Sequence, residues 1–164
     1  AGALDPRLHI GDIVLSIDAI EHDMDAGGLD YRPGVIPDME VREGFDGTRF
    51  MASGELRALA ERTAASALPD VHVLTGTVLS GDVFIASKEQ KDRLTGTFSG
   101  AACCEMEGAS IAHVSFLNGL PFLIIRAISD GADDGALMDY PTFEKHAAAN
   151  SIKLCLGMLE DYEV

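Results

Sequence analysis

Two acidic side chains flank a methionine in Glu105-Met106-Glu107, where an apolar run gives way to a helical pattern. Carboxylates at such a point would lie over the carboxyl edge of a sheet, where open α/β sheets bind ligands. Acidic residues also favour the first turn of a helix because of its dipole. Taken alone, that simpler explanation is the more common one, so the pair indicates a site only if other polar groups converge there.

A second polar group lies in and just after the aliphatic run 121–128, which contains Arg126 and is followed by Ser129-Asp130. A buried guanidinium requires an acidic partner, and Glu105 can supply it, either as a structural ion pair or within a site. Asp130 lies at a predicted strand exit, where a partly desolvated acid can keep its proton near neutral pH. That property is what a general acid requires.

A third group is the segment Ser80-Gly81-Asp82-Val83-Phe84-Ile85, at the end of another predicted strand. Phe84 could stack on a flat ligand while adjacent backbone groups bind the edge of that ligand. A core phenylalanine in a turn fits the segment equally well.

Other candidate residues carry less chemistry. His22, Asp23 and Asp25 do not have the spacing of a helical metal-ligand pair, so a solvated or interface loop is the preferred interpretation. Cys103 and Cys104 have no neighbouring base and are interpreted as small core residues. We expect no metal site and no organic cofactor.

The elements that must position these residues alternate between strand and helix, which predicts an α/β sheet with several parallel neighbours. A long excursion, residues 23–50, separates the first strand from the first helix. The final helix carries an apolar stripe through Phe143, Ala147, Ile152, Leu156 and Leu159. The predicted strands are 11–20, 71–79, 101–104 and 121–128, and the predicted helices run from a Ser53 cap to Pro69, from a Ser87 cap onward, over 106–117 and over 142–162.

Composition limits the class of protein. The 164 residues contain 27 acidic and 12 basic side chains, a formal net charge of −15, which disfavours nucleic acid as a partner. Hydrophobic residues make up 47%, enough for one ordinary globular domain. The sequence contains no apolar run of about 20 residues that could cross a membrane. Three cysteines, two of them adjacent, fit the reducing cytoplasm better than a disulfide framework.

The order of the motifs resembles the purine nucleoside phosphorylase and nucleosidase superfamily, and within it the 5′-methylthioadenosine/S-adenosylhomocysteine nucleosidases. The resemblance begins with Gly11-Asp12-Ile13-Val14 and continues through the 80–85 segment. Its most specific parts are the helix start at Glu105-Met106-Glu107 and the strand exit at Arg126-Ala127-Ile128-Ser129-Asp130. It implies a single-domain, three-layer α/β fold with a central twisted mixed sheet flanked by helices, of which residues 1–164 would form the C-terminal portion.

The same resemblance implies a role for each matching residue. Asp130 would protonate the adenine ring, with Ser129 orienting its carboxyl group. An aspartate suits adenine, because its carboxyl group can accept from the exocyclic amine while donating to the ring. The expected substrate-binding residues are Ala1, Gly2, Phe84 as the stacking ring, Ile85 at the purine edge, Met106 under the ribose, Glu107 at its hydroxyls, Glu105 and Arg126 as support, and Tyr140 over the 5′ substituent.

The resemblance also implies a homodimer in which Leu29, Tyr31, Ile36 and Pro37 complete the 5′ pocket of a neighbouring subunit. The family's first strands, with the glutamate that activates water, are expected to precede Ala1. The implied reaction is hydrolysis of the N-ribosidic bond of methylthioadenosine and S-adenosylhomocysteine. Three alternatives remain open at this point: a phosphate-dependent phosphorylase, an aminofutalosine hydrolase and a non-catalytic adenine-nucleoside binding module.

Overall fold

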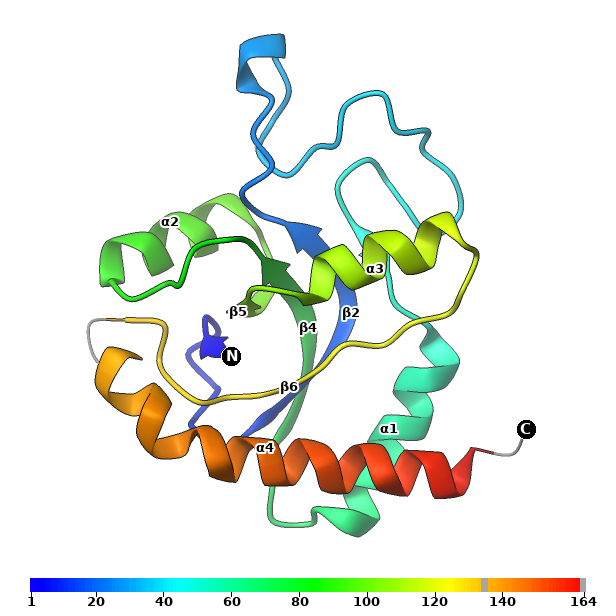
Figure 1. The fold of residues 1–164 in the computed structure, drawn as a ribbon, viewed down its shortest axis with the longest axis vertical. Helices are drawn as coiled ribbons and strands as arrows, with labels where there is room; N and C mark the ends of the chain where they lie inside the picture. Colours follow the sequence, from blue (N-terminus) through cyan, green and yellow to red (C-terminus); the bar gives the residue numbers. More distant parts are fainter. Residues whose placement is uncertain (134–135, 163–164) are drawn as a thin grey trace.

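The computed structural model describes residues 1–133 and 136–162, without the side chains of 136–142 and 144–147. Its strands form one sheet, and its helices lie around that sheet (Figure 1). The strands are β1 (Gly2–Ala3), β2 (Ile13–Glu21), β3 (Phe50–Met51), β4 (Val73–Ser80), β5 (Ala101–Glu105) and β6 (Ile125–Ala127). The helices are α1 (Gly54–Ala67), α2 (Lys88–Thr97), α3 (Gly108–Leu117), α4 (Ala136–Asp161) and the short 3-10 helix η1 (Gly27–Leu29).

The sheet is mixed and has the strand order β1-β5-β4-β2-β3, with β6 pairing β2 off this path. The central strands β2, β4 and β5 are parallel, whereas β1, β3 and β6 join antiparallel. In register, Glu21 pairs with Ser80 and Ser80 pairs with Glu105. The last residues of all three parallel strands therefore meet at one edge, as the polar strand ends predict.

The core lies on both faces of the central strands. Ile13 and Leu15 of β2 pack against Ala60 and Ala64 of α1 and against Leu154 of α4. Val14 and Ala19, on the opposite face, lie in a second cluster with residues of α3, including Ala109 and Ala112. Because β2 is apolar on both faces, helices cover it on both sides.

Helix caps predicted from the sequence are confirmed. The Ser53 side chain accepts a hydrogen bond from the Leu56 amide at the start of α1, and Ser87 accepts one from the Gln90 amide at the start of α2. Each cap satisfies one of the amides that a helix start leaves without an intrahelical partner.

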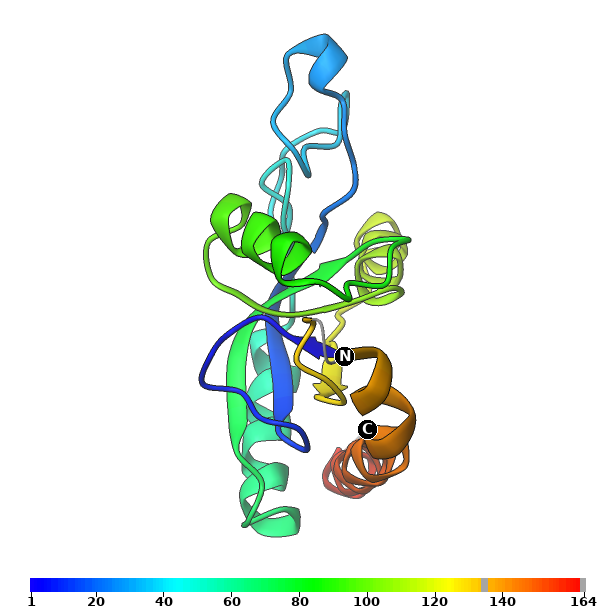
Figure 2. The same ribbon diagram turned by 90° about the vertical axis from the view of Figure 1, so that its left-hand side faces the viewer.

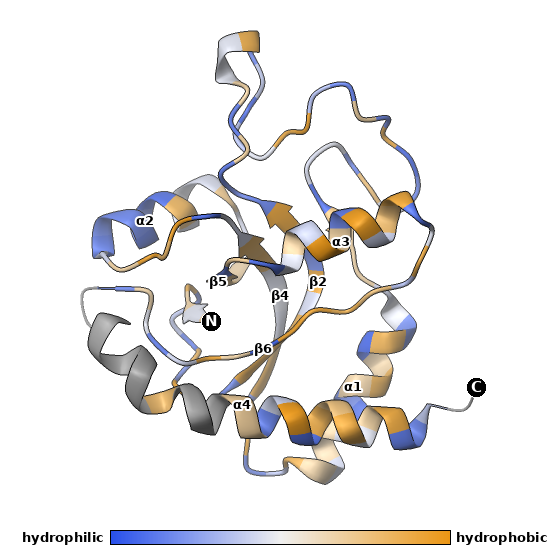
Figure 3. Ribbon diagram, in the orientation of Figure 1, coloured by the Kyte–Doolittle hydropathy of each residue, from blue (hydrophilic) through white to orange (hydrophobic). Residues whose placement is uncertain are grey.

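Two expectations about elements are wrong. The run 121–128 forms only a three-residue strand, and Ile125 and Arg126 are half-buried. Three residues of the predicted α4 stripe, Ile152, Leu156 and Leu159, are exposed, so this part of the stripe does not face the core. Figure 3 shows hydrophobic residues interspersed with hydrophilic ones along the C-terminal half of α4. Instead, α4 packs through the face that carries Leu154, Gly157 and Asp161.

The close approach of α1 and α4 explains this choice of face. A Cβ atom at Gly157 would lie 2.6 Å from Thr63 Cγ2, and the Thr63 hydroxyl donates to Asp161 Oδ2 over 3.0 Å. Leu154 is fully buried between the layers. A glycine adds nothing to a hydrophobic stripe, so the pattern in the sequence selected the wrong side of the helix.

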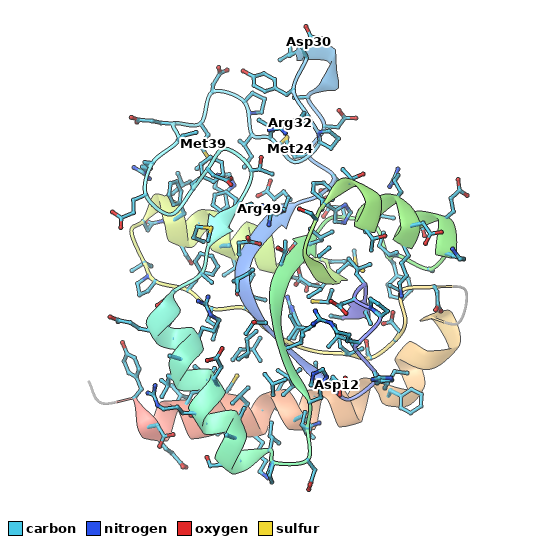
Figure 4. All side chains as sticks on the ribbon, turned by 180° about the vertical axis from the view of Figure 1, so that it is seen from behind. Asp12, Met24, Asp30, Arg32, Met39 and Arg49 are labelled. Carbon is cyan, nitrogen blue, oxygen red and sulfur yellow. The ribbon has the colours of Figure 1, made fainter. Side chains whose placement is uncertain are left out.

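One segment extends beyond the layers. Residues 22–49, called the arm below, project from the end of β2 and return to β3, and both ribbon views show the tip clear of the sheet and helices (Figures 1 and 2). Arg49 fixes the root of the arm: its Nη1 donates to Asp18 Oδ2 and to Thr77 Oγ1, each over 2.9 Å. Figure 4 shows Arg49 where the arm meets the sheet and Asp30 at the far tip.

Among the described residues, no helix combines the length and the apolar character that crossing a bilayer would need.

Candidate active site

A cavity of about 340 Å³ lies beside the carboxyl ends of β4 and β5. It brings together segments that are far apart in the sequence: the N-terminal strand, the loop after β4, the turn between β5 and α3, and the end of β6. The lining residues are Ala1, Gly2, Val83, Phe84, Ile85, Cys104, Glu105, Met106, Glu107, Arg126 and Asp130. Nine of these eleven are residues that the sequence predicted for the site.

Asp130 lies at one end of this cavity and is 2% exposed. The Ser129 hydroxyl donates to its Oδ2 and the Ala132 amide donates to its Oδ1, each over 2.9 Å. The Asp130 backbone is held as well, because its carbonyl accepts from the Ala3 amide over 2.9 Å. The carboxyl group therefore has a fixed orientation before any ligand arrives.

Arg126 and two glutamates form the polar wall. The guanidinium Nη2 contacts Glu105 Oε2 directly and lies 3.0 Å from Glu107 Oε2. The side chain of Glu105 is 5% exposed, whereas that of Glu107 is 65% exposed. The ion pair predicted between Arg126 and Glu105 is confirmed, and Glu107 is the carboxylate of the two that can accept from a ligand hydroxyl.

Ser80 is a site residue to which the sequence assigned no role. Its hydroxyl donates to Glu105 Oε1 and accepts from the Ala109 amide over 2.6 Å. The Gly108 amide also donates to Glu105, over 2.9 Å to Oε2. Every oxygen of Glu105 is thus occupied from within the protein, which makes Glu105 a support for Arg126. Ser80 and Glu105 are register partners at two adjacent strand ends, and this pairing is visible only in the structure.

Apolar side chains form the other walls. Phe84 and Met106 are each 40% exposed, so each presents a surface to the cavity, while Ile85 is buried. A flat heterocycle could pack against these surfaces while its polar edge meets backbone groups. The alternative that Phe84 is an ordinary core residue is wrong.

The glycine in Ser80-Gly81-Asp82 allows a close approach behind the cavity. A Cβ atom at Gly81 would lie 2.5 Å from His22 Nε2, so no larger residue fits without displacement. His22 is 7% exposed, and burial holds the pKa of its imidazole below the ordinary value.

The cysteines are confirmed as buried core residues. Burial raises the pKa of the Cys103 thiol far above its usual range and raises the pKa of Cys104 to about 12. Although Cys104 lines the cavity, its thiol stays protonated near neutral pH and cannot act as a nucleophile.

Four residues predicted for the 5′ pocket of a neighbouring subunit lie away from the cavity of their own chain. Leu29, Tyr31, Ile36 and Pro37 all lie on the arm and do not line the cavity; Leu29 is 70% exposed. The side chain of Tyr140, on α4, lies outside the described residues. No cluster of three or more His, Cys, Asp or Glu side chains in the described part of the chain could hold a metal ion.

Comparison with known proteins gives a consistent result. The model of the phosphorylase superfamily matches residues 1–160. A 5′-methylthioadenosine/S-adenosylhomocysteine nucleosidase of Treponema pallidum is 40% identical, over 98% of this chain and 65% of that protein. An aminodeoxyfutalosine nucleosidase of Helicobacter pylori is 35% identical, over 98% of this chain and 66% of that protein.

Structural similarity is equally extensive. The crystal structure of the 5′-methylthioadenosine/S-adenosylhomocysteine nucleosidase of Neisseria meningitidis, in complex with methylthio-immucillin-A, superimposes with a TM-score of 0.90 at 33% identity, over 99% of this chain and 67% of that one. The chain thus spans about two thirds of the length of these relatives. From the match to the family model, the sequence identities and the shared fold, the chain belongs to the phosphorylase superfamily and, within it, to the family of the 5′-methylthioadenosine/S-adenosylhomocysteine nucleosidases.

Proposed function

We propose that the protein hydrolyses the N-ribosidic bond of 5′-methylthioadenosine and S-adenosylhomocysteine, releasing adenine and the corresponding 5′-thioribose. The observation that carries the proposal is the placement of two different carboxylates in one cavity. Asp130 is buried and held by Ser129 and the Ala132 amide, whereas Glu107 is open and lies beside Arg126. Asp130 can act on the purine, and Glu107 can bind the ribose.

The chemistry of bond cleavage explains why both carboxylates are needed. A purine anion is a poor leaving group, and the ribose becomes oxocarbenium-like as the bond breaks. In the proposal, Asp130 transfers a proton to a ring nitrogen of adenine, so that neutral adenine leaves. Such a positioned acid typically contributes about 10²–10⁴-fold to the rate. The proposal assigns activation of the attacking water to a glutamate outside residues 1–164.

The remaining lining residues are proposed to position the substrate. Phe84 would stack on the purine, the backbone of Ile85 would bind the purine edge, and Met106 would lie under the ribose. Glu107 would accept hydrogen bonds from the ribose hydroxyls, an arrangement that its exposed carboxylate allows.

The 5′ side is proposed to be completed by a second copy of the chain. Leu29 and Tyr31 are exposed large hydrophobic side chains on the projecting arm. We propose a homodimer in which these residues, with Ile36 and Pro37, cover the 5′ substituent together with Tyr140.

The three cysteines are free, which supports a reducing, cytoplasmic location.

A phosphate-dependent reaction is not favoured. Phosphate would require several cationic or N–H donors beside the ribose. Arg126 is the one cation among the described side chains that line the cavity, and it is already engaged by Glu105 and Glu107.

A second candidate, hydrolysis of an aminofutalosine, has support from the Helicobacter pylori relative named as an aminodeoxyfutalosine nucleosidase. Such a substrate would use the same purine and ribose contacts and differ at the 5′ side. A non-catalytic binding module would have no use for a buried acid oriented as Asp130 is.

Product analysis tests the proposal. We expect release of free adenine and a reducing thioribose from methylthioadenosine in phosphate-free buffer, with no change in rate when phosphate is added. Turnover that requires phosphate and gives a sugar phosphate would identify a phosphorylase. Tight binding of the nucleoside without turnover would identify a binding module, and a strong preference for an aminofutalosine would select the second candidate.

A further inference from the structure

The loop after β6 has an unusual backbone for a segment that carries a buried acid. Ala132 adopts a φ of 50°, in the left-handed region that residues with a Cβ rarely occupy, and it is fully buried. The Ala132 amide donates to Asp130 Oδ1 over 2.9 Å. The orientation of the peptide unit between residues 131 and 132 therefore determines where one oxygen of Asp130 lies.

A lysine from a distant helix holds the other end of this same peptide unit. The half-buried Lys91, on α2, donates from Nζ to the Gly131 carbonyl over 2.8 Å. The Gly131 carbonyl and the Ala132 amide belong to one planar group and point in opposite directions. The ammonium, the peptide and the Asp130 carboxyl group thus form a continuous hydrogen-bonded chain, in which each bond polarises the next.

The helix that carries Lys91 is itself fixed to the purine side of the cavity. Ser87 accepts from the Gln90 amide, and Gln90 Oε1 accepts from the Ala86 amide over 3.0 Å, which locks the start of α2 to the residue after Ile85. Lys91 is the next residue of the helix. Burial raises the pKa of the Cys104 thiol, which lines the cavity, and the charge of Lys91 opposes that rise.

We propose that Lys91 is a positioning residue that holds the Asp130 carboxyl group in register with the purine-binding segment at Phe84 and Ile85. Its action runs through the Gly131–Ala132 peptide, and Lys91 itself need not touch the substrate. This inference rests on the proposed nucleosidase function only for its effect on turnover; the effect on the loop stands independently.

The test compares three variants of the protein. Lys91→Met keeps the aliphatic stem but removes the donor, Lys91→Arg keeps a charged donor, and Arg93→Met removes a charge from an exposed position on the same helix. The readouts are kcat and KM for adenine release from methylthioadenosine, and hydrogen exchange of the Ala132 amide, which needs no turnover.

We expect Lys91→Met to lower kcat about tenfold while KM changes by less than about twofold, because misplaced catalytic groups reduce the rate more than they reduce binding. We also expect exchange of the Ala132 amide to become about tenfold faster, because its peptide loses an anchor. Lys91→Arg should restore most of both properties, and Arg93→Met should leave both unchanged.

Several results would overturn the proposal. Unchanged Ala132 exchange in Lys91→Met would show that Lys91 does not hold the loop. An equal fall in kcat in Arg93→Met would indicate a general effect of charge, and a rise in KM alone would place Lys91 in substrate binding. If the unaltered protein releases no adenine but Lys91→Met still accelerates exchange, the proposed function fails while the anchoring by Lys91 stands.

Discussion

At the residue scale, the cavity separates carboxylates that support from carboxylates that are free to act. Glu105 is buried and receives hydrogen bonds from Ser80 and Gly108 besides its ion pair with Arg126. Glu107 has one of these contacts and is mostly exposed. These different surroundings indicate different roles: Glu105 orients the Arg126 guanidinium, and Glu107 is free to contact a ligand.

Replacing Ser80 by alanine tests the supporting network. The change removes a donor to Glu105 and leaves the Ala109 amide without its acceptor. An unsatisfied buried group costs about 1–3 kcal/mol, so we expect the free energy of unfolding to fall by that amount. Urea unfolding measures the loss. Ser110→Ala, at an exposed position on α3, the helix that carries Ala109, is the control, and equal stability of the two variants would contradict the network.

The buried imidazole of His22 predicts a pH dependence of stability. Burial lowers its pKa in the folded protein, whereas the unfolded chain takes up a proton near pH 6.5. Below that pH the unfolded state binds more protons than the folded state, so the free energy of unfolding falls as the pH decreases.

A His22→Asn variant keeps a polar side chain and removes this titration. We expect it to flatten the decline in unfolding free energy between pH 7 and the lowered pKa, as followed by urea unfolding at each pH. An identical slope in both proteins would show that other groups cause the decline.

Several of these residues were predictable because strong local signals mark them. Glu105 stands directly after one apolar run and Asp130 follows another with only Ser129 between, and an arginine within such a run requires an acid. The contact between Ser80 and Glu105 depends on the register of two strands, and the contact between Lys91 and Gly131 joins residues 40 positions apart. Neither arrangement leaves a periodic signal in the sequence.

At the element scale, the arm needs contacts of its own to hold it, because it projects beyond the sheet. Its root is fixed by Arg49, and Gly34 closes it against the sheet layer with a φ of 80°. A Cβ atom at Gly34 would lie 3.0 Å from both Ile20 Cγ2 and Phe98 Cε1. The backbone and the packing both require glycine at this position.

The variant Gly34→Ala should therefore destabilise the protein by about 1–3 kcal/mol, through a disfavoured φ and an overpacked contact. Gly28→Ala, at the tip of the arm, is the matched control, because a Cβ there meets nothing within 4 Å. We expect its free energy of unfolding to change by less than about 0.5 kcal/mol. Thermal or urea unfolding that ranks the two variants equally would contradict this description of the root.

Elements with strong caps and apolar runs were predicted well, as the Ser53 and Ser87 caps show. The helix α4 was predicted with the wrong buried face, because Gly157 provides close packing without hydrophobicity. The run 121–128 was predicted as a full strand, although only three of its residues pair regularly with β2. The apolar composition of a run does not show how many of its residues have a neighbouring strand to pair with.

At the scale of the whole molecule, the proposed dimer connects the arm to the cavity. The arm residues proposed for the 5′ pocket do not line the cavity of their own chain. If a second copy supplies them, Tyr31→Ala should raise KM for methylthioadenosine about tenfold, the effect of losing one buried apolar contact, and should leave KM for adenosine, which lacks the 5′-thio group, nearly unchanged.

Glu40 is also exposed on the arm, and Glu40→Ala should change neither the KM for methylthioadenosine nor the KM for adenosine. Sedimentation of the unaltered protein checks the assembly directly. A monomer at the concentration of the assay, or equal effects of Tyr31→Ala on both nucleosides, would remove the arm from the site.

The most direct test of the central claim is the rate of adenine release from methylthioadenosine by Asp130→Asn, measured in a single turnover without phosphate. The amide preserves the shape of the side chain, and its oxygen can still accept from the Ala132 amide, but it cannot transfer a proton. We predict that release slows by about 10²–10⁴-fold while the nucleoside still binds. Release at an unchanged rate would show that Asp130 is not the general acid and would contradict the account of the site.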